Sequence, residues 1–489
     1  MTILLTQAIQ VAGVTQPAGT TLTLEAGLEA DLVTRKCATF VSRPDQGITA
    51  EVFARTDQFT GGSVFSKPDG DPAFFAKLPN CIALLGDSRT AGNLTLNSGT
   101  NMSAWNSSGV VAWLRRLSGQ RFRVLYNGGV SGDRTDQINA RVSAALSTLP
   151  GMVIYWGGIN DIAQDYPTAG TSGVTAFNNI RDAGVRCISS GALFVVFADY
   201  PAAGWTSARV AQLQELNARL SNWAMNTPGV VLFDACKYIL DPASAISPTL
   251  RSGYTVDGIH PSMRGAYVLG KALHSALSSL APALGPRRVG GLQDVFANNP
   301  YELVPNGNHI TTSGGGGSGT GGVTGTVPAS VNITRSGSSA ATVVSTAACA
   351  DGVSGNDCVL TITGAASGDV IQYRPLPVLG NFVTGGTYQA MLDVDISGTV
   401  NLDDARLYWS YEDSGTTSYF AIDGNYSSAD RPGVPDGESF TQTLLTNQMT
   451  IPASGVTLTA VRMYMEIRFN GAGGAAVVKI RNVSLRRIL

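Results

Sequence analysis

The stretch Cys81-Ile82-Ala83-Leu84-Leu85-Gly86-Asp87-Ser88 indicates the fold of the central part of the chain. Its first five residues are all apolar, which is typical of a parallel strand buried on both faces and not of a half-exposed strand. Four further short apolar runs follow along the chain, at 123–126, 152–156, 193–198 and 230–233. We expect these five segments to form one parallel sheet.

Longer segments separate the apolar runs, and their pattern predicts helices at 110–117, 135–146, 173–189, 207–225 and 262–280. Strands that alternate with helices indicate a doubly wound α/β/α sandwich with a parallel sheet, over residues 77–285. In such a sheet the loops after the carboxyl ends of the strands line the ligand site.

Four short motifs fall at this edge of the predicted sheet. Gly86-Asp87-Ser88 follows the first strand, Gly132 follows the second, and Gly158-Ile159-Asn160-Asp161 follows the third. Asp257-Gly258-Ile259-His260 directly precedes the last helix. Segments that lie far apart in the sequence should therefore meet at one site.

The residue types in these motifs fit nucleophilic attack on a carbonyl group. A serine hydroxyl becomes a nucleophile only if a base reaches it, and His260 is placed for that task. Asp257 lies three residues earlier and would hold the imidazole in the tautomer whose other nitrogen accepts the Ser88 proton. Each motif also has a purely structural interpretation, in which its aspartate or serine caps a helix or a turn.

A tetrahedral intermediate also needs hydrogen-bond donors for its oxyanion. The backbone amides of Ser88 and Gly132 and the side-chain amide of Asn160 are the candidates. We interpret Asp133 and Asp161 as turn and capping residues. The other two histidines, His274 and His309, we interpret as solvated.

Jointly the four motifs, in this order, resemble the sequence blocks of the SGNH (GDSL-like) hydrolase family, over residues 77–285. The resemblance implies a flavodoxin-like fold and a carboxylic ester hydrolase. It implies Ser88 as nucleophile, His260 as base and Asp257 as its orienting carboxylate. It also implies an oxyanion hole formed by Ser88, Gly132 and Asn160.

The first motif departs from the commonest family form at one position. Arg89 stands where leucine is usual. A guanidinium beside the site would favour anionic or sugar substrates, and we therefore predict that Arg89 binds substrate. No hydrophobic lid segment is visible, which makes a lipase acting at an interface a poorer interpretation.

Composition excludes several other classes of function. The net charge is −2 and charges of both signs are interspersed, so we expect neither nucleic acid nor an anionic membrane as partner. No histidine pair has metal-ligand spacing, and we expect no metal or other cofactor. The first ten residues lack a basic region ahead of an apolar core, so we expect no ordinary export signal and synthesis in the bacterial cytoplasm.

The flanking regions differ in composition from the central one. Residues 1–76 read as a small β-rich module, with strands at 21–24 and 50–53, and residues 286–327 as a Gly/Ser/Thr-rich linker. Residues 328–489 alternate apolar and polar positions and predict an all-β jelly-roll sandwich. Cys349 and Cys358 lie close enough for a short disulfide loop, but one pair is weak evidence either way.

Aromatic residues within the predicted sandwich suit sugar rings, although core and cross-strand packing is the favoured explanation for any single one of them. They are Tyr408, Trp409, Tyr411 and Tyr419. The module resembles carbohydrate-binding jelly rolls, and the order of the parts resembles that of bacteriophage tail proteins. This resemblance implies action on a bacterial surface polysaccharide, from a virion tail or outside the cell, with other tail proteins as partners and a trimeric assembly.

The sequence therefore predicts a serine esterase that removes O-acetyl groups from a polysaccharide. Two alternatives stay open. One is a catalytically silent glycan-binding adhesin, and the other is a thioesterase or lysophospholipase that prefers long acyl chains.

Overall fold

The chain forms two compact units in the computed structural model, and each is described by itself. One comprises residues 1–78 and 279–283, and the other residues 79–278 and 284–489. The structure describes the backbone of six short strands between Thr2 and Thr49. Beyond these it describes residues 80–488, with gaps at 98–101, 245–247, 282–293, 296, 313–321, 338–339, 353 and 416.

The N-terminal unit contains a small antiparallel sheet with the strand order β4-β1-β5-β6 and a separate hairpin of β2 and β3. The predicted strand at 21–24 corresponds to β4, whereas the one predicted at 50–53 lies outside the described residues. The strands are β1 (Thr2–Leu5), β2 (Ile9–Val11), β3 (Val14–Gln16), β4 (Thr21–Thr23), β5 (Ala38–Arg43) and β6 (Ile48–Thr49).

The central region is built on a five-stranded sheet in the order β10-β7-β11-β12-β13, with every pair parallel. Along the chain this is the order 2-1-3-4-5 of a doubly wound fold, as predicted. All residues of β11 are buried, because helices cover both faces. The strands are β7 (Cys81–Gly86), β10 (Arg123–Gly129), β11 (Met152–Trp156), β12 (Leu193–Ala198) and β13 (Val230–Asp234).

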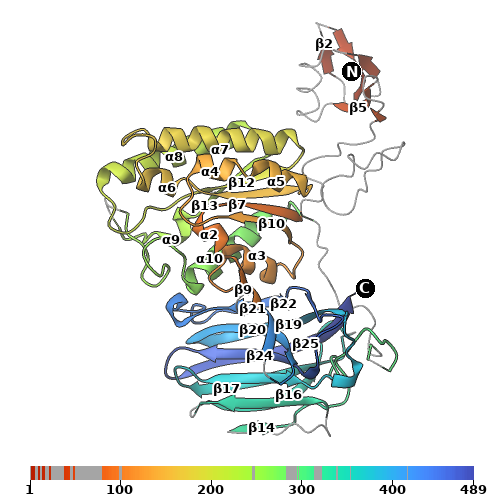
Figure 1. Ribbon diagram of the computed structural model, residues 1–489. Helices are drawn as coiled ribbons and strands as arrows, with labels where there is room; N and C mark the ends of the chain where they lie inside the picture. The colour runs from red at the N-terminus through yellow and green to blue at the C-terminus, as the bar shows by residue number, and fades with distance from the viewer. Residues whose placement is uncertain are drawn as a thin grey trace. The chain divides into compact units, whose positions relative to one another are not determined.

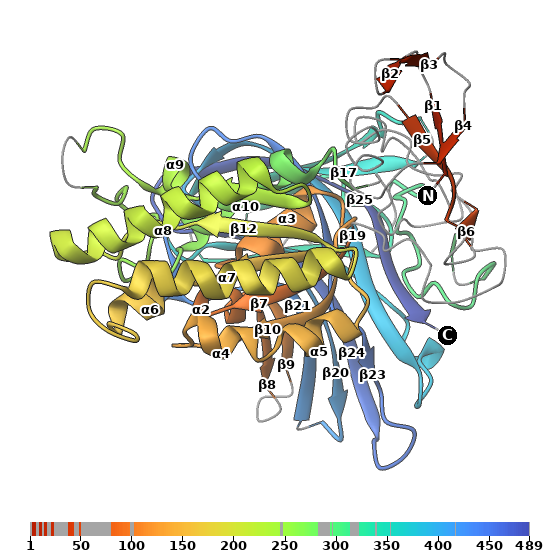
Figure 2. The ribbon, with the colours of Figure 1, turned by 90° about the horizontal axis from the view of Figure 1, so that it is seen from above.

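Helices lie on both sides of this sheet (Figure 1). One layer contains α4 (Thr135–Asn139), α5 (Val142–Ser147), α6 (Ile159–Ala163), α7 (Ser172–Ser189) and α8 (Ser207–Asn226). Their apolar residues pack on alternate residues of the strands in one core. The other layer contains α2 (Ser88–Ala91), α3 (Val110–Leu117), α9 (Cys236–Ile239) and α10 (Met263–Leu277). Seen from above, α7 crosses over the strands (Figure 2).

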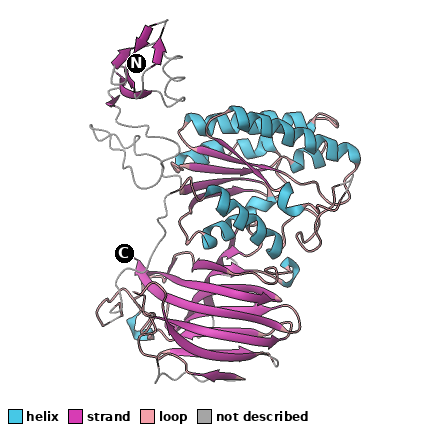
Figure 3. Ribbon diagram, turned by 180° about the vertical axis from the view of Figure 1, so that it is seen from behind, coloured by secondary structure: helices cyan, strands magenta, loops and turns pink. Residues whose placement is uncertain are grey.

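The C-terminal region consists almost wholly of strands (Figure 3). One sheet has the order β14-β16-β17-β25-β19-β22, with β23 also paired to β19, and the other begins β15-β18-β24-β20-β21. Residues from both sheets share one hydrophobic core, so the region is a β-sandwich, whereas jelly-roll connectivity stays a prediction. The strands are β14 (Val323–Gly325), β15 (Val331–Ser336), β16 (Ala341–Ala348), β17 (Asn356–Ala365), β18 (Val370–Pro375), β19 (Thr387–Val400), β20 (Leu402–Asp413), β21 (Thr417–Asn425), β22 (Phe440–Leu445), β23 (Met449–Thr450), β24 (Leu458–Phe469) and β25 (Gly474–Ile488).

The aromatic residues singled out in the sequence divide between the two faces of this sandwich. Trp409 and Tyr411 are buried in its core, so they do not face a ligand. Tyr408, the residue before Trp409 on β20, points to the opposite face and packs against Tyr464 of β24, with ring centroids 4.8 Å apart. Strand alternation thus assigns most of the predicted sugar-binding cluster to the core.

Part of the segment predicted as a linker belongs to the sandwich instead. Leu303 and Val304 are buried in its core. Glu302 is fully buried and accepts hydrogen bonds from Ser484 Oγ at 2.6 Å and from Arg486 Nε at 3.1 Å. The low-complexity run that suggested a flexible coil lies largely at 313–321, outside the described residues.

A hairpin of the central region continues the second sheet of the sandwich. The hairpin consists of β8 (Leu94–Asn97), which begins three residues after α2, and β9 (Met102–Asn106). The strand β9 pairs in parallel with β21 (Figure 2). The full order of this sheet is therefore β15-β18-β24-β20-β21-β9-β8. Backbone hydrogen bonds thus join the central region to the sandwich, which the sequence did not suggest.

Side chains of α3 reinforce this connection. Trp113 packs edge-on against Tyr267 of α10 and Phe440 of β22, at centroid distances of 5.0 and 6.2 Å. Arg116 is fully buried and forms ion pairs with Asp404 at 2.9 Å and with Asp423 at 2.8 Å. The contact between the two regions therefore includes both an apolar cluster and a buried charge cluster.

Candidate active site

Ser88 is presented by a sharp turn between β7 and α2. Asp87 caps the short helix, since its carboxylate accepts a hydrogen bond from the Arg89 N–H at 3.0 Å. Gly86 allows the close approach of the turn to β11: a Cβ there would lie 2.3 Å from the Trp156 carbonyl oxygen and 2.1 Å from Thr90 Oγ1. Any larger residue at position 86 would displace the turn that holds Ser88.

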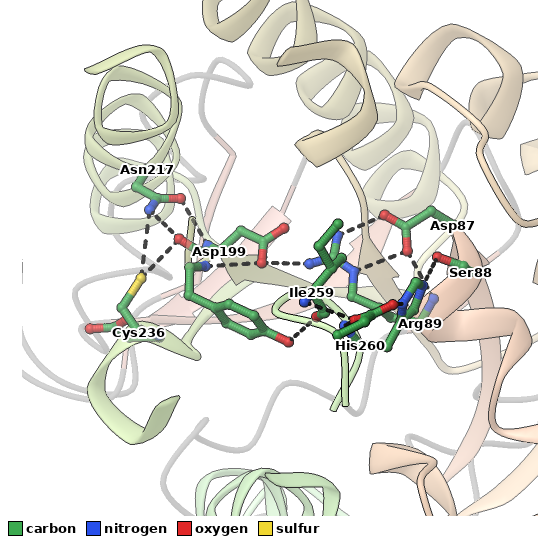
Figure 4. A network of polar contacts seen from close by, with 11 residues as sticks. Asp87, Ser88, Arg89, Asp199, Asn217, Cys236, Ile259 and His260 are labelled. Atoms are coloured by element: carbon green, nitrogen blue, oxygen red, sulfur yellow. Dashed lines mark hydrogen bonds and ion pairs between the residues drawn. The ribbon is translucent and has the colours of Figure 1, made fainter. Parts of the chain in front are cut away.

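Ser88, His260 and Asp257 form a continuous hydrogen-bonded relay. His260 Nε2 lies 2.7 Å from Ser88 Oγ (Figure 4). His260 Nδ1 lies 2.7 Å from Asp257 Oδ2. With the Asp257 carboxylate ionised, the ring proton resides on Nδ1, and Nε2 is left to accept the serine proton. The structure therefore brings together the three residues predicted as nucleophile, base and orienting carboxylate.

The local backbone keeps Asp257 ionised. Although partial burial alone would raise the pKa of Asp257, hydrogen bonds from the His260 N–H, the His260 ring and the Ile259 N–H hold this pKa below its ordinary value. The side chains of His260 and Asp257 are 38% and 51% exposed. His260 and Asp257 are thus partly exposed to solvent.

Gly132 and Asn160 lie in the loops after the next two strands. Gly132 has φ +82°, a conformation that favours glycine, and Gln164 Nε2 donates to its carbonyl oxygen at 2.8 Å. Asn160 Nδ2 donates to the Asp133 carbonyl oxygen at 2.9 Å, which leaves its second N–H for a ligand. Among the described residues no backbone carbonyl accepts the N–H of Ser88 or Gly132.

Arg141 supports the loop that carries Gly132, and the sequence analysis did not single this residue out. Its guanidinium donates to the carbonyl oxygens of Gly86 at 3.2 Å and Gly128 at 2.9 Å and forms an ion pair with Asp133 at 2.5 Å. One side chain therefore connects the turn before Ser88 with the loop that carries Gly132. Asp133 is a structural residue, as predicted.

Asp161 caps a helix, but not its own. Its carboxylate accepts hydrogen bonds from Thr135 N at 2.9 Å and Thr135 Oγ1 at 2.6 Å, at the start of α4. Asp161 is fully buried, and burial raises its pKa to about 6. This contact joins the start of α4 to α6.

The prediction that Arg89 binds substrate is wrong for this structure. The Arg89 side chain has no exposed surface, because it forms ion pairs with Asp87 at 2.7 Å and Asp199 at 2.6 Å and lies over the Trp156 ring at 4.6 Å. The two carboxylates and the indole face compensate the buried charge and draw the guanidinium inward. Asp199 follows β12 directly. Its position at the carboxyl edge of the sheet was the sequence feature that could have marked it as part of the site.

His309 also differs from its predicted solvated state. It is fully buried, with Nε2 2.6 Å from Tyr373 Oη and Nδ1 3.0 Å from the Asn356 carbonyl oxygen. His274 is half-buried, and its Nε2 lies 3.0 Å from Arg121 Nη2. Neither histidine contacts the Ser88 relay.

The structure also bears on metal binding, membrane insertion and disulfide formation. Within the described part of the chain, no group of three or more His, Cys, Asp and Glu residues is arranged to hold a metal ion. No helix among the described residues has the length and apolarity needed to span a membrane. Cys349 and Cys358 are both free thiols.

Comparison with known proteins identifies the central region. Residues 84–268 match the model of the GDSL-like Lipase/Acylhydrolase family. This central domain is GDSL-like. The matched range contains all four motifs and covers less than half of the chain. Residues 1–83 and 269–489 lie outside the match. A search of curated proteins gave no match.

Solved structures similar to the chain match about two fifths of its length. A GDSL-like lipase from Bacteroides thetaiotaomicron is 18% identical, with a TM-score of 0.31, over 41% of this chain and 87% of that one. A variant of an acetyl-xylooligosaccharide esterase from Geobacillus Stearmophilus is 17% identical, with a TM-score of 0.31, over 42% and 95%. A Clostridium thermocellum family 3 carbohydrate esterase is 19% identical, with a TM-score of 0.29, over 41% and 96%.

Proposed function

We propose that the protein is a serine esterase, and the continuous Ser88–His260–Asp257 relay is the observation that carries this proposal. Ser88 Oγ attacks the ester carbonyl while His260 Nε2 takes its proton. The amides of Ser88 and Gly132 and the free N–H of Asn160 stabilise the oxyanion. His260 then protonates the departing alcohol.

The acyl-enzyme is hydrolysed by the reverse sequence of proton transfers. A water molecule gives a proton to His260 Nε2 and attacks the acyl carbonyl, and the second tetrahedral intermediate collapses with return of the proton to Ser88 Oγ. Asp257 stays ionised throughout and stabilises the imidazolium, because its hydrogen bonds hold its pKa below the ordinary value. The products are a carboxylic acid and an alcohol.

We infer that the acyl group is acetyl and that the alcohol is a hydroxyl of a polysaccharide. Two observations support a polymeric substrate. The relay is partly exposed to solvent, and the sandwich contacts the chain close to both catalytic segments. The strand β9 of the hairpin that follows α2 pairs with β21, and the Pro432 carbonyl oxygen accepts a hydrogen bond from Arg264 N at 3.0 Å, four residues after His260.

Glycan binding by the sandwich is part of this proposal. Tyr408 and Tyr464 form a partly exposed aromatic pair on its outer face, and this pair takes the place of the cluster predicted from the sequence. Paired aromatic faces beside polar side chains suit sugar rings. The Ser88→Ala variant of the full chain should retain binding to an acetylated glycan, and Tyr408→Ala/Tyr464→Ala should weaken it.

A role in a bacteriophage tail, with action on host surface glycan outside the bacterial cell, is the wider proposal. It rests on the order of the parts in the sequence. A trimer in light scattering, and incorporation of the protein into virions, would support it.

Hydrolysis of 4-nitrophenyl esters of increasing acyl length tests the esterase against its alternatives. We expect turnover that is greatest for acetate and that is lost in Ser88→Ala. Preference for long acyl chains would instead favour a thioesterase or lysophospholipase. Glycan binding without turnover of any ester would favour the adhesin.

A further inference from the structure

A buried polar network connects the turn that carries Ser88 with the loop that carries His260. It begins at Asp87, whose two carboxylate oxygens accept hydrogen bonds from Arg89 Nε at 3.1 Å and Nη2 at 2.7 Å. On its other side Arg89 donates from Nη1 to Asp199 Oδ1 at 2.6 Å. Figure 4 shows this path from Asp87 through Arg89 to Asp199. These three side chains are at most 1% exposed.

Asp199 is held firmly at the end of β12. The side chain of Asn217, from α8, accepts from the Asp199 N–H at 2.9 Å and donates to the Asp199 carbonyl oxygen at 2.7 Å. The Cys236 thiol donates to the same carbonyl oxygen at 2.9 Å. Asp199 Oδ1 in turn accepts the N–H of Tyr200 at 3.0 Å. The network thus has a fixed point in the sheet, to which Arg89 and Tyr200 both attach.

Tyr200 completes the path to the catalytic base. Its hydroxyl donates to the carbonyl oxygen of Ile259 at 2.7 Å. This oxygen belongs to the peptide group whose N–H is that of His260, and the His260 N–H donates to Asp257 Oδ1 at 2.8 Å. Because a peptide group is planar, hydrogen bonds at both its oxygen and its nitrogen fix the orientation of the whole group. The Cα of His260 is therefore held in place opposite Ser88.

The charge states in the network keep its donors and acceptors constant. Burial raises the pKa of Tyr200, so its hydroxyl remains a donor at any working pH. Burial opposes the charged form of Arg89, but Asp199 and Asp87 outweigh it and raise the pKa of Arg89. The residue that departs from the commonest family motif is thus a permanent cation between two carboxylates.

We propose that Tyr200 is a positioning residue for His260 and that Arg89 and Asp199 couple it to the Ser88 turn. None of the three touches the substrate. This inference rests on the proposed esterase function. In this proposal Arg89 fixes the relative positions of Ser88 and His260 and does not bind substrate.

Replacement of the Tyr200 hydroxyl tests the proposal. Tyr200→Phe removes one hydrogen bond and keeps the ring, which is fully buried. Tyr155→Phe is the matched control, because Tyr155 is equally buried and its hydroxyl donates to Asn139 Oδ1 at 3.5 Å and, within the described residues, to no member of the network. With 4-nitrophenyl acetate we expect kcat to fall roughly 10-fold in Tyr200→Phe at nearly unchanged KM, since misplacement of a catalytic group slows the chemical step. Tyr155→Phe should retain its kcat.

The melting temperatures of the two variants separate positioning from loss of fold. An equal loss of kcat in both variants, or retention of kcat within twofold in Tyr200→Phe, would overturn the proposal. The low-field proton NMR signal of the His260 Nδ1–H gives a readout that needs no turnover. We expect it in the wild type and in Tyr155→Phe, and expect it broadened or shifted in Tyr200→Phe. An unchanged signal would contradict the positioning role even if the protein hydrolysed no ester.

Coupling to Arg89 is tested by a double-mutant cycle. Arg89→Lys keeps a cation but cannot donate to Asp87 and Asp199 from one planar group. If both residues act on His260 through one network, the combined loss of kcat in Arg89→Lys/Tyr200→Phe should be clearly smaller than the product of the single losses. Independent effects would contradict the coupling. Absence of ester hydrolysis in the wild type would instead count against the proposed function.

Discussion

Removal of the buried cation Arg116 should destabilise the contact between the GDSL-like domain and the sandwich. Arg116 lies on α3, and its partners Asp404 and Asp423 lie on β20 and β21 of the sandwich. All three side chains have no exposed surface. In Arg116→Met the aliphatic volume is largely kept, while two buried carboxylates lose their ion-pair partner. The experiment therefore isolates the charge from the packing.

The expected loss is large because the carboxylates cannot regain water. Breaking a buried pair by removing one partner typically costs about 3 to 5 kcal/mol. Asp404 keeps hydrogen bonds from Ser107 Oγ and from the Ala405 N–H at 2.7 Å. Asp423 keeps hydrogen bonds from the Leu445 N–H at 2.8 Å and from Gln120 Nε2 at 3.3 Å, and these contacts moderate the penalty. Burial already raises the pKa of Asp404, so the variant should favour its protonated form. We expect a loss of about 3 kcal/mol in the free energy of unfolding.

Guanidinium denaturation followed by tryptophan fluorescence measures this loss, since Trp113 lies against the Arg116 guanidinium at 4.9 Å. Arg219→Met is the matched control: its ion pair with Glu215 is 43% and 37% exposed, and its loss should change stability by less than about 0.5 kcal/mol. The triple variant Arg116→Met/Asp404→Asn/Asp423→Asn should recover part of the loss. A loss below about 1 kcal/mol in Arg116→Met would refute the reasoning.

Three further predictions concern the catalytic domain. Asn160→Ala should lower kcat roughly 10²- to 10³-fold in steady-state ester hydrolysis, because one oxyanion donor is removed, and a tenfold or smaller effect would count against that role. Asp257→Asn should lower kcat roughly 10³- to 10⁴-fold with the fold intact by circular dichroism, because Nδ1 would lose the acceptor that sets the tautomer, and an unchanged kcat would contradict this. Asp161 has a folded-state pKa of about 6, above its ordinary value of 3.8, so its ionisation in the folded state costs stability above pH 6 and this cost disappears as the pH falls toward 4. Urea denaturation should therefore show that the wild type gains about 2.4 kcal/mol relative to Asp161→Asn between pH 7 and pH 4, and a pH-independent difference would exclude the buried ionised carboxylate.

The doubly wound sheet was predictable because burial on both faces leaves a simple sequence signal. Each apolar run that predicted a strand corresponds to one, with bounds that agree within a few residues. The helix predicted over 135–146 is the exception, since the structure divides it into α4 and α5 at Ala140 and Arg141. Arg141 turns toward the carbonyl oxygens of Gly86 and Gly128 there, and this tertiary contact has no local signal.

The convergence of Ser88, Gly132, Asn160 and His260 was predictable for a related reason. All of them follow strands or precede a helix at the carboxyl edge of a parallel sheet, where topology alone brings the loops together. The surroundings of Arg89 were not predictable. Its second partner, Asp199, lies 110 residues away, and a charged residue is expected to be exposed unless distant partners are known.

The contact between the sandwich and the central domain was also not predictable from the sequence. The strand β9 pairs with β21, more than 300 residues further along the chain, and its sequence Met-Ser-Ala-Trp-Asn has no strong strand pattern. Pairing of so distant a partner is decided by tertiary contacts and not by local propensity. The burial of Trp409 and Tyr411 was not predictable either, because an alternating pattern shows that the two faces of a strand differ but not which face packs on the core.

Acetate release from an acetylated polysaccharide, compared between the wild type and Ser88→Ala of the full chain, tests the central claim most directly. The account predicts release by the wild type, preference for acetyl over longer acyl groups, and loss of release in Ser88→Ala with an unchanged melting temperature. Equal acetate release by both proteins would contradict the assignment of Ser88 as nucleophile, and no release from any ester by the folded wild type would contradict the esterase itself.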